Sequence, residues 1–259
     1  MTVVVKLGGH ALDQIDADAP RLRELAEDLA AICAEGVVVV HGGGPQIEAL
    51  ARRLGVASRF VEGLRVTDDA TLEVVALALS QVNLALTAAL THAGLRAVGV
   101  AGAAAGVRGQ PEGETWGRAA LRVEVEAGVL GDLVTAGWVP IVSSLGLDSA
   151  GGLVNVNADT VAGAVAGSLG ARALLLLSDI DQVRTDPHDP NSAVAQTSGA
   201  QIAELLASGA IRDGMRPKAR AALDALGAGA SRVIVGSGRG EHAVREILAG
   251  RAPATEVRE

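Results

Sequence analysis

Two lysines, an aspartate and several glycines stand where predicted strands end or predicted helices begin. Lys6-Leu7-Gly8-Gly9 ends a first apolar strand, and His41-Gly42-Gly43-Gly44-Pro45 follows a second one, Val37-Val38-Val39-Val40. Glycine lets backbone N–H groups approach an anion, and the start of a following helix adds the positive end of its dipole. Alone, the first loop also fits a plain turn with a solvated lysine. Together, the two loops and the charge of Lys6 predict a phosphate site.

A third polar group, Asn155-Val156-Asn157-Ala158-Asp159, precedes a helix that the pattern predicts over 159–169. Asn and Asp are preferred N-cap residues, so capping accounts for one of the three. Strand alternation puts Asn155, Asn157 and Asp159 on one face. We therefore expect two amides and a carboxylate to point into a single site.

The fourth group, Asp213-Gly214-Met215-Arg216-Pro217-Lys218, is a glycine turn that runs into another predicted helix. The helix dipole favours anions at this end, so a lysine here is explained either by a bound phosphate or by solvation at the surface. Arg65 raises the same question, and a specific carboxylate is a bidentate partner for it.

Short apolar runs alternate with stretches of helical period, which indicates βαβ units. We expect one α/β domain over 1–259, a three-layer αβα sandwich around an open, mainly parallel sheet. The predicted strands are 2–7, 37–41, 96–100, 138–143, 172–178 and 231–235, and the predicted helices are 20–35, 45–54, 69–93, 159–169, 199–208, 216–227 and 240–249.

Two stretches, 59–67 and 107–125, alternate around glycine as β-hairpins do. Hairpins beyond the carboxyl ends of a parallel sheet would form lids, because ligands bind at that edge. On the predicted helix 69–93 we expect the polar residues Gln81 and Asn83 to face solvent. His10 and His41 have no carboxylate or second histidine at ligand spacing, so we interpret both as structural.

Composition narrows the class of protein. A single cysteine, Cys33, excludes intrachain disulfides and cysteine-built metal clusters, which fits a cytoplasmic protein. No apolar run reaches the roughly 20 residues that span a bilayer, so we expect no membrane insertion. With 30 acidic and 22 basic residues, one Phe, two Trp and no Tyr, the chain lacks the basic surface and stacking aromatics of nucleic-acid binders. Small ligands are the expected partners.

In this order and spacing, Lys6-Leu7-Gly8-Gly9, His41-Gly42-Gly43-Gly44, Asn155-Val156-Asn157-Ala158-Asp159 and Gly214-Met215-Arg216-Pro217-Lys218 resemble the amino acid kinase family. Glu62-Gly63-Leu64-Arg65-Val66-Thr67-Asp68 is similar to its N-acetylglutamate kinase branch. The similarity runs from Val3 to about Gly250. It implies ATP-dependent phosphorylation of the side-chain carboxylate of N-acetyl-L-glutamate, the second step of arginine synthesis, with Mg2+ held mainly by the nucleotide phosphates.

The resemblance also implies roles for individual residues, each taken from the matching motif. Lys6 and Lys218 would contact the transferred phosphoryl group, and Asp159 would hold both lysines. Arg65 would bind the substrate's α-carboxylate. The remaining expected contacts are Gly43, Gly44, Asn155 and Asn157 for the substrate, and Gly8, Gly9, Ser178, Asp179, Asp213, Gly214 and Met215 for ATP. The amino acid would bind in an N-terminal lobe, about 1–155, and ATP in a C-terminal lobe, about 156–259.

The sequence departs from the family pattern in two places. Ala101-Gly102-Ala103-Ala104-Ala105-Gly106 stands where a serine and charged residues are expected, and Asp181-Gln182 replaces small or apolar residues at the expected rim of the adenosine pocket. The chain begins on its first strand, whereas relatives inhibited by arginine carry a helical extension there that links dimers into rings. We therefore expect a homodimer that is insensitive to arginine.

Three other functions compete with this one. A related kinase would phosphorylate aminoadipate or glutamate linked to an acidic carrier protein and would need a basic patch, for which Arg52, Arg53 and Arg59 are candidates. A non-catalytic sensor of amino acid or nucleotide would not need the combination of Lys6, Asp159 and Lys218. A dinucleotide-dependent reductase would need the G-x-G-x-x-G motif, which the two glycine loops do not form.

Overall fold

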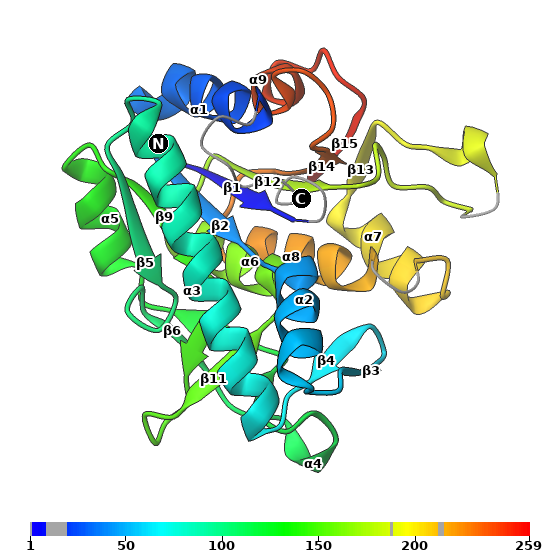
Figure 1. The fold of residues 1–259 in the computed structure, drawn as a ribbon. Helices are drawn as coiled ribbons and strands as arrows, with labels where there is room; N and C mark the ends of the chain where they lie inside the picture. Colours follow the sequence, from blue (N-terminus) through cyan, green and yellow to red (C-terminus); the bar gives the residue numbers. More distant parts are fainter. Residues whose placement is uncertain (1, 9–19, 187–188, 212–214) are drawn as a thin grey trace.

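A computed structural model describes residues 2–8, 20–186, 189–211 and 215–259. Its centre is an eight-stranded sheet with helices on both faces (Figure 1). All neighbouring strands are parallel except β14 and β15. The predicted three-layer αβα fold with a mainly parallel sheet is thus confirmed. In spatial order the strands are β13 (Gln196–Ser198), β15 (Ala254–Arg258), β14 (Val233–Ser237), β12 (Ala173–Ser178), β1 (Val3–Leu7), β2 (Val37–His41), β9 (Val139–Ser143) and β5 (Ala97–Ala101).

Both faces of the sheet are buried, which explains why its strands read as unbroken apolar runs. In β1, Val3, Val5 and Leu7 pack with one core cluster, whereas Val4 packs with a second cluster on the opposite face. Lys6 shares the face of Val4, because side chains alternate along a strand. The lysine side chain is therefore directed to the second cluster.

The two faces carry different helices. On the face of Val3 lie α1 (Pro20–Ile32), α3 (Asp69–His92) and α9 (Ala243–Leu248), and the 3₁₀ turn η2 (Cys33–Glu35) follows α1 directly. On the face of Lys6 lie α5 (Gly128–Thr135), α6 (Ala158–Ser168) and α8 (Met215–Gly227). Helix α2 (Gly44–Leu54) packs beside α3, and α7 (Gly199–Ala207) packs beside α8.

Helix α3 is long and apolar enough to cross a membrane by length and composition, although its sequence contains no unbroken apolar run of that length. Its inner residues Val82, Leu86 and Leu90 are almost completely buried in the core beside β5 and β9. A helix packed in this way is also typical of the core of a globular protein.

A second, five-stranded sheet and a hairpin lie beyond the central sheet (Figure 1). The hairpin of β3 (Arg59–Val61) and β4 (Leu64–Val66) agrees with the prediction for 59–67. The prediction of a simple hairpin over 107–125 is incomplete, because two strands of the second sheet come from the chain after β9. This sheet contains, in order, β7 (Ala119–Ala120), β11 (Leu153–Val156), β10 (Leu145–Leu147), β6 (Val107–Gly109) and β8 (Val123–Val125), and α4 (Gly113–Trp116) precedes β7.

The sheet divides by sequence at the contact between β1 and β12. Strands β1, β2, β9 and β5 come from the first 143 residues, and β12, β14, β15 and β13 come from residues after 172. The turn-rich stretch after β12 contains η3 (Pro190–Ser192) before β13. Loops from both halves of the chain therefore meet at the carboxyl ends of β1 and β12, where ligands of open α/β sheets bind.

Candidate active site

Lys6, Asp159 and Lys218 form one ion-paired cluster, although they are far apart in the sequence. Lys6 Nζ lies 2.8 Å from Asp159 Oδ1, and Lys218 Nζ donates a 3.1 Å hydrogen bond to Asp159 Oδ2. Lys6 belongs to β1, Asp159 to the first turn of α6 and Lys218 to the first turn of α8. Parallel packing of α6 and α8 on the Lys6 face of the sheet brings the three together.

Burial makes the charge balance of this cluster important. The side chains of Lys6, Lys218 and Asp159 are 8%, 15% and 4% exposed. Burial by itself would raise the pKa of the Asp159 carboxyl, but the two ammonium groups lower it below its usual value. Two lysines on one carboxylate leave one formal positive charge without a partner in the cluster, and a buried charge of this kind favours an anionic ligand.

The glycine loops flank this cluster. A Cβ atom on Gly8 would lie 2.1 Å from Lys6 Nζ, so the absence of a side chain leaves room for the ammonium group. Gly42 approaches the start of α6, since a Cβ there would lie 3.4 Å from the Cβ of Ala158. Gly43 and Gly44 open α2, and their N–H groups donate no backbone hydrogen bond within the described residues. These two N–H groups are available to an anion.

Arg65 is held by three side chains. Its Nη1 lies 2.6 Å from Glu48 Oε1 and donates a 2.8 Å hydrogen bond to Ser58 Oγ, and Phe60 covers the guanidinium at 4.7 Å. Burial would raise the pKa of Glu48, but Arg65 and Ser58 outweigh burial and lower it. Arg65 Nε and Nη2 make no hydrogen bond to the described residues, so one edge of the guanidinium stays available. Sequence reasoning did not find Glu48.

Asn155 and Asn157 do not share a strand face with Asp159, so the alternation argument was wrong. Strand β11 ends at Val156 and α6 begins at Ala158, because Asn157 is the N-cap of the helix. Its Oδ1 accepts hydrogen bonds from the backbone N–H groups of Asp159 and Thr160. Asn157 is thus the one polar residue of the three that helix capping explains.

Asn155 instead faces the strand of Arg65. Its Nδ2 donates a 2.9 Å hydrogen bond to Thr67 Oγ1, and that hydroxyl donates to the backbone oxygen of Arg65. Thr67 is completely buried. This chain of hydrogen bonds links the segment before α6 to the β3–β4 hairpin.

Asn83 was expected at the surface of α3 but points inward. Its Nδ2 donates to the backbone oxygen of Ile141 and lies 2.9 Å from Nε2 of the buried His41. Gln81 is exposed, as expected. Helical periodicity alone did not separate the two, because Asn83 lies at the margin of the buried stripe.

The residues expected to border ATP are only partly described. Ser178 ends β12 beside β1, Asp179 follows it and forms a 3.7 Å ion pair with Arg239, and Met215 opens α8 against the core. Gly9, Asp213 and Gly214 lie outside the described residues, as does His10. Asp181 is exposed, whereas Gln182 donates to the backbone oxygen of Ala254.

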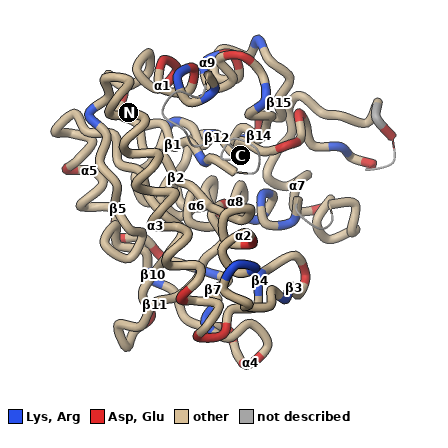
Figure 2. Tube along the Cα trace, viewed as in Figure 1, with Lys and Arg blue, Asp and Glu red and all other residues tan. Residues whose placement is uncertain are grey.

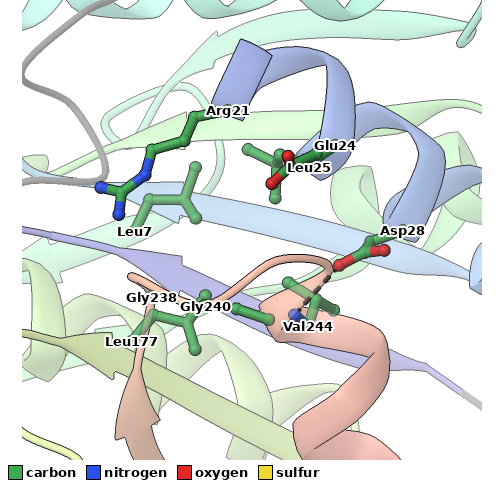
Figure 3. Close-up of a pocket in the computed structure, with 10 residues that line it drawn as sticks. Leu7, Arg21, Glu24, Leu25, Asp28, Leu177, Gly238, Gly240 and Val244 are labelled. Carbon is green, nitrogen blue, oxygen red and sulfur yellow. Dashed lines mark hydrogen bonds between the residues drawn. The ribbon is translucent and has the colours of Figure 1, made fainter.

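The opposite face of β1 has a different environment. A cavity of about 40 Å³ lies between α1, the ends of β1 and β12 and the start of α9, and Figure 3 shows the residues that line it. Asp28 of α1 is 1% exposed and accepts hydrogen bonds from the backbone N–H groups of Val244 and Arg245 and from His242. Asp28 therefore caps α9, and this cluster is separated by the sheet from Lys6 and Asp159.

Within the described ranges, no three His, Cys, Asp or Glu side chains lie close enough together to hold a metal ion. The alanine-rich loop 101–106 also offers no charged side chain. In it, Gly102 passes so close to the backbone oxygens of Leu145 and Ser143 that any Cβ would collide with them. Packing thus explains the glycine, and we find no structural reason for the surrounding alanines.

The fold and the cluster of two lysines on one aspartate agree with a family assignment. The sequence profile of the amino acid kinase family matches residues 1–237, so the chain belongs to the amino acid kinase family. This is a family of phosphotransferases.

Among curated relatives, the chain is 41% identical to an acetylglutamate kinase from Deinococcus radiodurans, over 96% of this chain and 98% of the relative. It is 37% identical to an acetylglutamate kinase from Symbiobacterium thermophilum, over 94% and 86% of the two chains. A solved structure of carbamate kinase from Giardia lamblia bound to AMP-PNP aligns with a TM-score of 0.74 and 19% identity, covering 100% and 98%. This last likeness supports the fold alone.

Proposed function

We propose that this protein is an acetylglutamate kinase, which transfers the γ-phosphoryl group of ATP to the side-chain carboxylate of N-acetyl-L-glutamate. The observation that carries the proposal is the buried cluster in which two lysines share Asp159 and leave one positive charge for an anion. Phosphoryl transfer needs such a charge where negative oxygens gather in the transition state. The relatives named acetylglutamate kinase, at 37% and 41% identity, support the substrate.

The reaction needs positioning and charge neutralisation more than proton transfer. A carboxylate is ionised at neutral pH, so it can attack the γ-phosphorus without a general base. A bond forms between the carboxylate oxygen and phosphorus while the bond to the β–γ bridging oxygen breaks, and ADP leaves with that electron pair. Lys6 and Lys218 would neutralise the transferred group from two elements, and Asp159 would fix both ammonium groups.

The remaining residues would bind the two substrates. Arg65 would take the α-carboxylate of the acetylamino acid through the guanidinium edge that Glu48 leaves open. Gly43 and Gly44 would donate N–H groups beside the reacting carboxylate, and Asn155 would lie at the same end through its contact with Thr67. Gly8, Ser178, Asp179 and Met215 would border ATP. Mg2+ would be bound chiefly by the nucleotide phosphates.

The order of the strands supports a functional division of the chain. Because the first 143 residues supply the sheet on one side of the β1–β12 contact, residues 1–155 would bind the amino acid and 156–259 would bind ATP. The carboxylate and the γ-phosphoryl group would then meet over Lys6, which lies at the boundary.

Helix α3 supports a homodimer. Leu77 and Leu84 are 54% and 71% exposed, and they are two turns apart on its outer surface. We propose that this surface pairs with a second copy of the chain. We also propose that the enzyme is cytoplasmic, where it uses free ATP. Light scattering should give twice the chain mass, and Leu77→Glu with Leu84→Glu should give the single-chain mass. A monomeric parent protein would contradict the dimer.

The test of the reaction is an ADP-release assay with Mg-ATP and hydroxylamine, which converts an acyl phosphate to a stable hydroxamate. N-acetyl-L-glutamate, L-glutamate, L-aspartate and 2-aminoadipate are compared, and Lys218→Ala is the matched inactive control. Hydroxamate only from N-acetyl-L-glutamate is the expected result. No hydroxamate from any of the four would contradict the proposal.

One observation favours a second candidate, a kinase for an amino acid attached to an acidic carrier protein. Arg52 and Arg53 at the end of α2 and Arg59 on β3 are all exposed, and they are close in the chain. Figure 2 shows, however, that acidic positions are interspersed with basic ones over α2, β3 and β4. The same assay with a carrier-linked glutamate or aminoadipate distinguishes the two candidate functions. Only the carrier-dependent kinase is expected to phosphorylate the carrier-linked substrate and not the free one.

A further inference from the structure

The ring of His41 is held in one neutral tautomer. His41 is the last residue of β2 and is completely buried. Its Nδ1 lies 2.8 Å from the carbonyl oxygen of Gly42 and its Nε2 lies 2.9 Å from Asn83 Nδ2. A carbonyl oxygen only accepts, so Nδ1 carries the proton and donates it to Gly42. Nε2 then accepts from Asn83.

The orientation of Asn83 is fixed independently. Its Nδ2 also lies 2.8 Å from the carbonyl oxygen of Ile141 in β9, which identifies this atom as the amide nitrogen. Burial lowers the pKa of His41 to about 4, although the bond to Gly42 works in the opposite direction, so the ring is neutral at pH 7. Asn83 therefore selects the tautomer in which Nδ1 is the donor.

This hydrogen bond fixes the peptide between Gly42 and Gly43. The described residues contain no cis peptide bond, and in a planar trans peptide the C=O and N–H groups point in opposite directions. Because the Gly42 oxygen is held toward the His41 ring, the Gly43 N–H must point away from it. Glycine at both positions leaves this peptide otherwise free to rotate.

The direction away from the His41 ring is the direction of the candidate active site. Along β2, Val39 and His41 face the α3 side, and Val40 faces the α6 side, where it pairs in register with Lys6. Gly42 itself passes over the first residue of α6. The Gly43 N–H is therefore turned to the side of the sheet on which Lys6 and Asp159 lie.

We propose that His41 is a positioning residue that orients the Gly43 N–H toward the reacting groups, and that Asn83 enables it by fixing the ring tautomer. The proposal rests on the proposed phosphoryl transfer, because an aligned N–H donor acts on charge that develops during that reaction. His41 touches no reacting atom in this scheme. It acts through one backbone peptide.

Nitrogen-15 NMR of the ligand-free protein tests the tautomer directly and needs no substrate. At pH 7 His41 should show a protonated Nδ1 and an unprotonated Nε2. A ring with the proton on Nε2, or a charged ring, would overturn the proposal. Since this measurement does not depend on the reaction, its failure is distinguishable from failure of the proposed function.

Asn83→Asp tests the consequence, because a carboxylate accepts from Nε2 and favours the neutral tautomer with the proton on Nε2, in which Nδ1 can no longer donate to Gly42. We expect a shifted His41 ring signal and a kcat reduced by about tenfold to a hundredfold, with the KM values of both substrates within about threefold. Gln81→Glu, the same amide-to-acid change on an exposed position of α3, should leave the ring signal and kcat unchanged.

If Asn83→Asp does not fold, Asn83→Ala removes the donor without adding a charge and should lower kcat in the same direction. A parent-like kcat in a folded Asn83 variant whose His41 tautomer has changed would overturn the proposal. So would a loss of kcat with the ring signal unchanged, because the effect would then not pass through His41.

Discussion

Arg65 and Glu48 form an ion pair of 2.6 Å between the β3–β4 hairpin and helix α2. The Arg65 side chain is 8% exposed, and Glu48 is 40% exposed. The pair occupies Nη1, together with Ser58, and leaves Nε and Nη2 without a partner among the described residues. A guanidinium presents its donors in a rigid fork, so fixing one edge also fixes the direction of the other.

The first prediction concerns Glu48. Glu48→Ala should raise the KM for N-acetyl-L-glutamate about tenfold, because Arg65 loses the acceptor that orients it, while kcat and the KM for ATP stay within about twofold. Glu48→Gln keeps an acceptor oxygen and should restore most of the affinity. Glu246→Gln removes a carboxylate from a pair with Arg251, an arginine that is 59% exposed, and serves as the control. A lower KM in Glu48→Ala would show that Glu48 competes with the substrate.

A second prediction separates binding from phosphoryl transfer. Lys218→Ala should lower kcat by about a hundredfold or more with a small change in KM, because its charge acts mainly on the transition state. Arg65→Ala should mainly raise the KM for the acetylamino acid. Steady-state kinetics with both substrates varied measures these changes in kcat and KM. Equal effects of both variants on nucleotide binding would contradict the division of roles between Lys218 and Arg65.

Asp28 gives a prediction about stability. It is buried and accepts three hydrogen bonds that join α1 to α9, so Asp28→Ala should lower the free energy of unfolding by about 2–4 kcal/mol. The kcat of the remaining folded enzyme should change little, because the cluster lies across the sheet from Lys6. Asp132→Ala, at an exposed position of α5, is the control for urea denaturation. Equal stability of the two variants would disprove the role of Asp28.

His41 predicts a pH dependence of stability. Its pKa is lowered from 6.5 to about 4 by burial, so between these values the unfolded chain binds a proton that the folded protein does not. Neutral His41 therefore contributes its full share to the free energy of unfolding above about pH 6.5. The free energy of unfolding then decreases as pH falls toward 4, by about 3 kcal/mol in all. Urea denaturation at pH 7 and pH 4.5 gives the free energy of unfolding of the parent protein and of His41→Asn. Between these two pH values it should decrease less in the variant than in the parent.

Much of the fold could be predicted from local patterns. Runs such as Val37–Val40 and the helical stripe of 69–92 depend on neighbouring residues, so six of the eight strands of the central sheet and the long helix were found within a few residues. The short strands β10, β11, β13 and β15 were missed. None of these four has an apolar run of four or more residues, so the pattern did not distinguish them from loops.

The sequence by itself determined which residue types were available to bind phosphate: two lysines, one aspartate and the glycine loops, in the order of the family motifs. Only the tertiary structure decided that Lys6 and Lys218 meet on Asp159, that Glu48 holds Arg65, and that Asn83 turns inward to His41. These contacts join residues 17 to 153 positions apart in the chain. Such pairs depend on strand order and on the face of the sheet that each helix covers, which local propensity does not encode.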